Sequence, residues 1–348
     1  KHVTGVQTCA VPIYGKIDLR QAESVENLVS ASSHRGVNSA LNGLRGKLSK
    51  EIASMGDEMI DVLSYSEHLL DVSEEDLTTA NISYIISKTA KMHEMAQKLI
   101  ENYSTCRIMT YGAVVVLCGP VNSGKSTLFN SLVGSNRAIV NREPGTTRDL
   151  LEAMIIIDGV PITLVDTAGL REASNDIEIE GVRRARDYIK KADLPFVIND
   201  ITVGITSMES IDNTLFKDNH ILNIYNKTDL FSQKNIKKFR SVFTPGLFTS
   251  ALTGAGLGEL KNHIVTALDL ESNTGENFGI TTARQYNAIL KSDAAMAAVI
   301  EITEQYPLQL ELVSFELQNA LNSIEDLLGT KTADEVLNNM FDSFCVGK

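Results

Sequence analysis

The feature that most constrains the fold is a glycine-rich octapeptide, GPVNSGKS, at residues 119–126. It follows a short apolar run at 113–118 that is of strand length, and it opens a segment with helical character. This order of strand, glycine-rich turn and helix is that of the P-loop, in which backbone N–H groups turn toward phosphate oxygens. In that pattern Lys125 reaches the β and γ phosphates and the Ser126 hydroxyl binds Mg²⁺. The octapeptide therefore predicts an α/β domain that binds a nucleotide.

Further apolar runs of strand length follow the octapeptide. They lie at residues 154–157, 162–165, 196–198 and 221–225. Helical stretches separate most of them, a pattern typical of a mainly parallel sheet with helices on both faces. We assign this α/β domain to residues 109–270.

Two polar tetrapeptides directly follow predicted strands. In Asp166-Thr167-Ala168-Gly169 the acidic group would face Mg²⁺ through water, and a glycine N–H could sense the γ-phosphate. In Asn226-Lys227-Thr228-Asp229 the Asp carboxylate can accept hydrogen bonds from N1 and the N2 amino group of guanine. Adenine cannot offer that pair of donors, so the order of the motifs predicts GTP rather than ATP.

A third segment, 250–252, lies where the loop that supports the base is expected, although many GTPases have Lys at the position of Leu252. The nucleotide-binding residues that these motifs predict are Asn122, Ser123, Gly124, Lys125, Ser126, Thr127, Asp166, Thr167, Ala168, Gly169, Asn226, Lys227, Asp229, Ser250, Ala251 and Leu252.

The sequence GTTRD at 145–149 is a candidate switch loop, because a threonine hydroxyl there could complete the Mg²⁺ shell only while a γ-phosphate is bound. Ras-like enzymes orient the attacking water with a Gln just after the Asp-x-x-Gly motif, but this chain has Leu170 there. Another group must take that role. The acidic segment 175–180 offers Asp176, Glu178 and Glu180, and the residues alone do not choose among them.

Helical patterns lie on both sides of the α/β domain. Asp18 and Gln21 form a capping-box pattern, followed by an apolar stripe of Ala22, Val25 and Leu28. Apolar spacings predict one long helix over 41–63, another over 82–99 and a third over 310–328. Their methionines are interpreted as core residues.

The economical interpretation is one all-α domain, residues 15–108 and 271–348, interrupted by the α/β domain. Three successive domains are the alternative. Residues 1–13 have no starting Met and no clear periodicity, so we expect a non-native, adapter-like segment that replaces lost upstream residues.

Composition limits the function classes. No apolar run approaches the roughly 18 residues that cross a bilayer, so we expect no membrane contact. The four cysteines lack the spacing of a metal site or a disulfide scaffold, which favours a reducing cytoplasm. With a formal net charge of −12, the chain as a whole repels phosphate backbones, so any nucleic-acid contact needs a local basic patch.

Because of four motifs taken together, the chain resembles the MnmE/TrmE family of tRNA-modification GTPases. The resemblance extends from residue 15 to the last residue. The four motifs are GKIDLRQAE at 15–23, GTTRD at 145–149, DTAGLRE at 166–172 and the terminal FCVGK at 344–348. The resemblance implies a folate-binding domain before the helices, expected to be missing here, and a K⁺-stimulated GTPase that is activated when two G domains meet in a homodimer. The departures are Leu252, Pro195 within a strand-like run, and Asn199-Asp200 at the end of that run.

The resemblance also assigns roles to individual residues. It places the catalytic glutamate at Glu178, which would act through a bridging water, and adds Thr147 to Ser126 on Mg²⁺. The implied K⁺ ligands are Asn122, Asn141, Glu143 and Thr146.

The family acts with the flavoprotein MnmG/GidA on C5 of the wobble uridine of certain tRNAs, in a carboxymethylaminomethyl-type modification. Its one-carbon donor is a 5-formyltetrahydrofolate-type molecule, and the resemblance places Lys16 and Lys348 near that site. Cys345 is a possible functional thiol, and packing without reactivity is the alternative.

Two other functions remain open. An Era-like ribosome-assembly GTPase would share the nucleotide motifs but should carry a basic RNA-binding domain after them, whereas this C-terminal block is acidic. A GTP-dependent dimerisation scaffold with little turnover is compatible with Leu170, whereas Glu178 and Asn122 favour hydrolysis.

Overall fold

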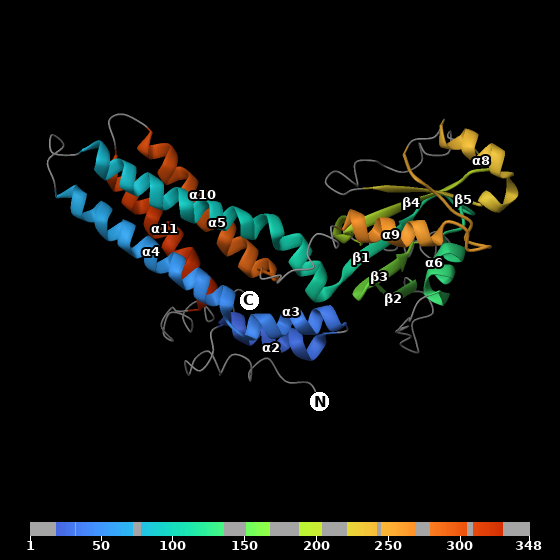
Figure 1. Ribbon diagram of the computed structural model, residues 1–348, viewed down its shortest axis with the longest axis horizontal. Coiled ribbons are helices and arrows are strands. Elements are labelled where there is room, and N and C mark those ends of the chain that lie inside the picture. Colours follow the sequence, from blue (N-terminus) through green and yellow to red (C-terminus); the bar gives the residue numbers. More distant parts are fainter. Residues whose placement is uncertain are drawn as a thin grey trace, which may run out of the picture. The chain divides into compact units, whose positions relative to one another are not determined.

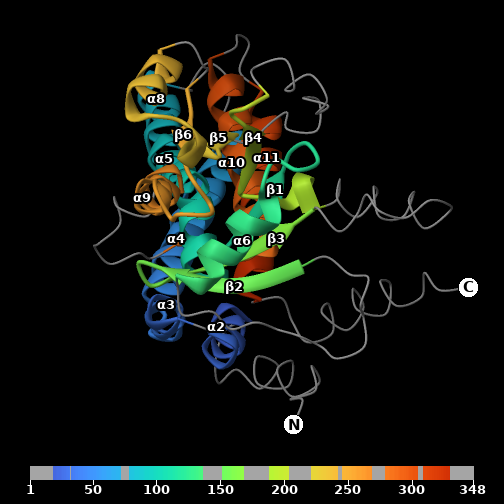
Figure 2. The same cartoon turned by 90° about the vertical axis from the view of Figure 1, so that its right-hand side faces the viewer.

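The computed structural model describes residues 19–31, 33–71, 78–135, 151–167, 188–203, 221–241, 245–268, 279–304 and 309–329. The chain divides into two compact units. The helical unit contains Lys1–Ala31, Gly36–Thr110 and Glu276–Lys348, and the α/β unit contains Ser32–Arg35 and Tyr111–Gly275. Figure 1 labels the elements of both units, and Figure 2 turns the view by 90°. No helix in this described part of the chain is long and apolar enough to cross a membrane.

The α/β unit is built on a six-stranded sheet with strand order β2-β3-β1-β4-β5-β6. All neighbouring strands pair in parallel except β2 and β3. The strands are β1 (Ala113–Cys118), β2 (Leu151–Ile157), β3 (Val160–Asp166), β4 (Leu194–Asp200), β5 (Leu222–Asn226) and β6 (Leu247–Phe248). The helices described in this unit are α6 (Lys125–Gly134), α8 (Gln233–Arg240) and α9 (Leu257–Ala267), with a 3₁₀ turn at Thr228–Leu230.

The antiparallel pair β2–β3 is a hairpin that our sequence interpretation did not separate from the parallel strands. Its turn is Asp158-Gly159, and both residues have positive φ, at 48° and 80°. Asp-Gly is the preferred pair for this left-handed two-residue turn, because its twist matches that of the strands.

Pro195 lies in β4, between β1 and β5, although proline cannot donate a ladder hydrogen bond. The β4–β5 pairing begins only one residue later, at Phe196↔Leu222. Pro195 therefore precedes the two-sided part of the strand, which makes the proline compatible with a central position.

In the helical unit, segments from before and after the α/β insertion share one core. Buried side chains of α4 (Lys47–Leu70), α5 (Thr79–Tyr111), α10 (Ala283–Thr303) and α11 (Leu310–Leu328) form a single cluster. Figure 1 shows these four helices alongside one another. Met55, Met59, Met92 and Met296 are all in this core. The fold class is thus confirmed: a P-loop-type α/β unit interrupts an all-α one.

Arg284 fastens three helices of this unit together. Its Nε donates to Oε1 of Glu23 on α2 (Leu19–Ser30) at 2.8 Å, and its Nη1 donates to the carbonyl of Asp326 on α11 at 3.0 Å. A cation is favourable at the C-terminal end of a helix, where the last carbonyls lack partners. The start of α10, with its Thr282–Gln285 capping box, is therefore bound to both halves of the helical unit.

The prediction of one helix over 41–63 was wrong. Helix α3 (His34–Leu44) ends and α4 begins at Lys47, because Gly46 takes a left-handed conformation with φ of 67°. The carbonyl of Leu44 accepts a hydrogen bond from Gln21 Nε2 at 3.2 Å instead of continuing a helix. The apolar spacing continues across this break, which is why the pattern did not reveal it.

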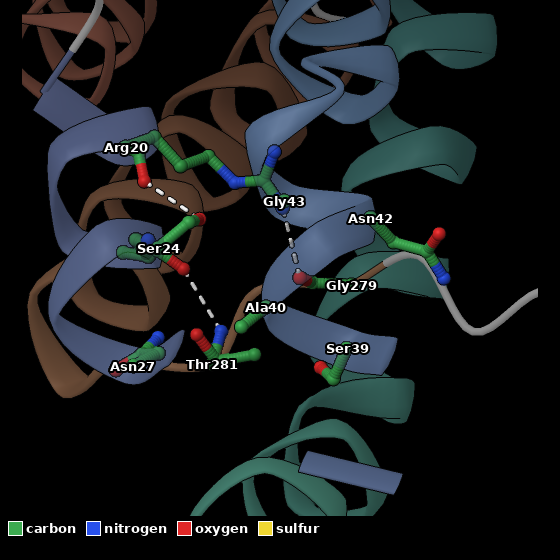
Figure 3. A pocket seen from close by; sticks show the side chains of 10 residues that line it. Arg20, Ser24, Asn27, Ser39, Ala40, Asn42, Gly43, Gly279 and Thr281 are labelled. Carbon is green, nitrogen blue, oxygen red and sulfur yellow. Dashed lines mark hydrogen bonds between the residues drawn. The ribbon is translucent and has the colours of Figure 1, made fainter. Parts of the chain in front are cut away.

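The apolar stripe predicted for the first helix was wrong at Val25 only, because Ala22 is buried and Leu28 is half-buried. Val25 is 39% exposed, whereas Arg20, Ser24 and Asn27 are buried. Arg20 Nη2 donates to the carbonyl of Gly279 at 3.2 Å, so this face of α2 is held by polar contacts (Figure 3). The cavity beside them has a volume of about 20 Å³, which is room for a single water.

Candidate nucleotide-binding site

The P-loop connects β1 to α6 and depends on two glycines with positive φ. A Cβ at Gly119 (φ 143°) would lie 2.3 Å from the carbonyl oxygen of Ile198, and one at Gly124 (φ 93°) would lie 2.2 Å from Nδ2 of Asn226. Neither position has room for a side chain. The backbone therefore forms the open cradle that a phosphate group requires.

Charged and hydroxyl groups gather at this cradle. Lys125 is buried, and its Nζ donates to the carbonyls of Gly119 at 3.1 Å and Pro120 at 2.7 Å. The Ser126 hydroxyl donates to Oδ2 of the fully buried Asp166 at 2.7 Å. A hydroxyl and a carboxylate are hard oxygen donors, which suit Mg²⁺, so the residues present fit that ion.

Thr167 ties the end of β3 to β1. Its Oγ1 donates to the carbonyl of Leu117 at 2.8 Å, and its N–H donates to the same carbonyl at 3.4 Å. The two strand ends that carry Asp166 and the P-loop are therefore fixed to each other.

Asn226 joins the P-loop to the loop that follows β6. Its Nδ2 donates to the carbonyl of Ser123 at 3.0 Å, and its Oδ1 accepts from the N–H of Ala251 at 2.9 Å. All three residues are buried. One side-chain amide therefore sets the position of the two loops between which a nucleotide would lie.

Asp229, the predicted guanine acceptor, is exposed, and one of its carboxylate oxygens accepts a side-chain hydrogen bond. Its Oδ1 accepts from Ser250 Oγ at 2.5 Å, and Ser250 Oγ in turn accepts from the N–H of Thr253 at 3.2 Å. The carbonyl of Ala251 accepts from Ser131 Oγ on α6 at 2.5 Å. Leu252 is 78% exposed, so the residue that departs from the common Lys makes no buried contact.

Our sequence interpretation missed an ion pair at the same edge of the sheet. Lys227 Nζ lies 2.6 Å from Oδ2 of Asp200, the last residue of β4. The register Asp200↔Asn226 places these two strand ends side by side. The sequence did carry a signal for this ion pair, namely an acidic residue at the end of the neighbouring parallel strand.

Cys118 ends β1 directly before the P-loop. Burial raises the pKa of its thiol to about 12, an effect that Lys125 opposes and Asp166 reinforces. The thiol therefore stays protonated at neutral pH, and a protonated buried thiol is unreactive.

Two more predicted residues of the P-loop lie at its surface. Asn122 is exposed with φ of 63°, and Thr127 is exposed on the first turn of α6. The predicted residues that lie outside the described residues are Lys16, Asn141, Glu143, Thr146, Thr147, Ala168, Gly169, Glu178, Cys345 and Lys348.

Comparison with known proteins decides the family. The family model described as "MnmE helical domain" matches residues 19–345. The chain belongs to the MnmE family. It is 32% identical to the tRNA modification GTPase MnmE of Alkaliphilus metalliredigens, over 96% of this chain and 73% of the relative. It is 34% identical to the MnmE of Dichelobacter nodosus, over 96% and 74%.

Among solved structures, the G domain of the T. maritima FeoB iron transporter aligns at 29% identity and a TM-score of 0.34, covering 44% of this chain and 98% of that one. Membership in the MnmE family confirms the family predicted from the four motifs and rules out the Era-like alternative.

Proposed function

We propose that this chain is a GTP hydrolase that acts, with the flavoprotein MnmG/GidA, in C5 modification of the wobble uridine of certain tRNAs. The observation that carries the proposal is the double hydrogen bond of Asn226, which joins the P-loop to the Ala251 loop beside Asp229. A phosphate cradle and a guanine-accepting carboxylate thus belong to one connected set of loops. The relatives at 32% and 34% identity are named tRNA modification GTPases.

Base selection follows from the chemistry of Asp229. Its carboxylate presents only acceptors, which match the N1 and N2 donors of guanine. Ser250 donates to one of its oxygens and so restrains its orientation. Adenine offers no such pair of donors, so GTP binds in preference to ATP.

On the phosphate side, Lys125 and the P-loop N–H groups bind and orient the β and γ phosphates. Ser126, with Asp166 behind it and Thr147, would hold Mg²⁺, and the amide oxygen of the exposed Asn122, with Asn141, Glu143 and Thr146, would hold K⁺. When bound, the two cations neutralise charge that develops on the transferred phosphoryl group. Glu178 orients the attacking water in place of the Gln that Leu170 replaces.

The same proposal includes the pairing of two copies, the one-carbon donor and the recognition of tRNA. Two copies pair through their G domains in the cytoplasm, and a 5-formyltetrahydrofolate-type donor supplies the one-carbon unit, with Lys16 and Lys348 near it and Cys345 as a possible functional thiol. A formal charge of −12 disfavours broad contact with tRNA. Recognition of tRNA therefore rests on a local basic patch or on the partner.

The test is hydrolysis of GTP measured in K⁺ and, at equal ionic strength, in Na⁺, with ATP as the control nucleotide. We expect hydrolysis of GTP only, and a faster rate in K⁺. Equal rates in the two salts would overturn the ion assignment. Tight GTP binding with no turnover in K⁺ would instead favour the dimerisation scaffold.

A further inference from the structure

The ion pair between Asp200 and Lys227 lies at the carboxyl ends of β4 and β5. Lys227 follows the last residue of β5 and has a left-handed backbone, with φ of 69° and ψ of 34°. Its Nζ lies 2.6 Å from Oδ2 of Asp200, and the Asp200 side chain is only 14% exposed. In the chain, Lys227 lies between Asn226, which joins two loops of the site, and Asp229, the predicted guanine acceptor.

Asp200 is itself held firmly. Its second oxygen, Oδ1, accepts from the N–H of Thr202 at 2.9 Å and from the Thr202 hydroxyl at 2.6 Å. The turn after β4 is also tied to β5, because the N–H of Ile201 donates to the carbonyl of Asn226 at 3.2 Å. Both carboxylate oxygens are therefore engaged, and the group that pairs with Lys227 has a fixed position.

Charge supports this arrangement. Burial raises the pKa of the Asp200 carboxyl, but hydrogen bonds from Lys227 and Thr202 outweigh it and bring the pKa below its ordinary value. The carboxylate is thus ionised at neutral pH. Exposed ion pairs contribute little because both side chains must be ordered and solvent screens them. Here one partner is already ordered and mostly buried, so the pair restrains the lysine effectively.

We propose that Asp200 is a positioning residue of the guanine-nucleotide site, acting through Lys227. By holding the ammonium group it fixes the four-carbon stem of the lysine, which lies in the chain between Asn226 and the predicted base acceptor Asp229. A lysine side chain has many rotamers, and ordering them before binding lowers the entropy lost when the nucleotide binds. The inference rests on the proposed function, since it requires that this site binds GTP and GDP.

The experiment measures dissociation of a fluorescent GDP analogue by stopped flow in the full chain. We compare the wild type, Asp200→Asn, Lys227→Gln and the double variant. Each single variant should release GDP about tenfold faster, equivalent to about 1.4 kcal/mol. If Asp200 acts through Lys227, the double variant should be no faster than the faster single variant.

Asp193→Asn is the matched control, because Asp193 precedes β4 at its opposite end and its Oδ2 accepts from the N–H of Val114 at 2.8 Å. This control should leave GDP release unchanged. Equal acceleration by both Asn variants would show a general weakening of the strand and overturn the proposal, as would independent, multiplying effects of Asp200→Asn and Lys227→Gln.

Two readouts separate a positioning role from a purely structural one. Asp200→Glu, which keeps the charge, should restore most of the slow release, and the melting temperature of nucleotide-free Asp200→Asn should fall no further than that of Asp193→Asn. A wild type that binds GDP while Asp200→Asn releases it at the same rate overturns this inference alone. A wild type that binds no guanine nucleotide overturns the proposed function, and this inference with it.

Discussion

The base side and the phosphate side of the candidate site are held together in different ways. On the base side, side chains bond to backbone groups of remote segments: Asn226 reaches Ser123 and Ala251. On the phosphate side, Ser126 also reaches a remote residue, Asp166, but the charged group, Lys125, donates only to carbonyls of its own loop among the bonds described above, five and six residues away. The first set fixes the relative positions of loops, whereas the second holds a charged group against neutral partners.

This difference separates two tasks. In the proposed site, bonds between remote segments would preorganise the base pocket, so that guanine would meet groups already in place and lose little affinity to ordering. The Lys125 bonds to neutral carbonyls can be exchanged for stronger, charge-assisted bonds to phosphate oxygens. We therefore expect base-side variants to change affinity and phosphate-side variants to change turnover.

The largest effect is expected for Glu178→Ala. Loss of a positioned general base costs about 10² to 10⁴ in rate, so turnover of saturating GTP should fall within that range while GTP affinity and K⁺-induced pairing stay the same. Single-turnover hydrolysis, titration calorimetry and sedimentation measure the three quantities.

Asp176→Ala and Glu180→Ala are the controls for Glu178, because they remove neighbouring carboxylates from the same segment. A larger specific loss in either would move the role to that residue. If turnover of Glu178→Ala falls only together with pairing, Glu178 is structural, and the separation between affinity and turnover does not hold there.

The next effect is expected for Asn122→Ala. Removing one ligand of a charge-stabilising ion should lower the K⁺ stimulation by about 10²-fold, while nucleotide binding survives because Lys125 and the backbone cradle remain. Rates in K⁺ and Na⁺ are compared for the variant and the wild type. K⁺ stimulation at full wild-type strength would place the ion elsewhere.

The sequence predicted those parts of the molecule that depend on local patterns. The strand 113–118 and the P-loop were found because a buried strand is continuously apolar and the glycines have fixed spacing. Strand β6 was missed because it has only two residues. The turn at Gly46 was missed because the apolar spacing of Leu44 and Leu48 continues through it.

The sequence pattern could not predict contacts between residues that are far apart in the chain. The buried polar face of α2 depends on the Gly279 carbonyl, which is 259 residues from Arg20. The Lys227–Asp200 pair depends on the lateral order of β4 and β5. Local periodicity reports which residues are apolar but not which remote carbonyl or carboxylate satisfies a polar group.

On the base side, Asp229→Asn should weaken the binding of guanine nucleotides, GDP and GTP alike. Hydrogen bonds to a charged group contribute about 1.5 to 3 kcal/mol, so the affinity should fall about 10-fold to 100-fold. An amide presents a donor where the carboxylate presented acceptors, so the variant should also accept xanthine nucleotides better. Calorimetry with GDP and XDP measures both changes, and unchanged GDP affinity would remove Asp229 from the base pocket.

The smallest effect is expected for Ser250→Ala, which tests whether the base side is preorganised. The Ser250 hydroxyl donates to Oδ1 of Asp229 at 2.5 Å, and that oxygen belongs to the carboxylate that guanine would contact. Without this donor the carboxylate keeps its charge but loses its restraint, so GDP affinity should fall by about 3-fold to 10-fold. Turnover at saturating GTP should not change, because the phosphate side is untouched. In an Asp229→Asn background the same substitution should have a smaller effect, since the two residues act as one unit. A Ser250→Ala variant that lowers saturated turnover but not affinity would show that the base side contributes to catalysis, and the division between the two sides would have to be abandoned.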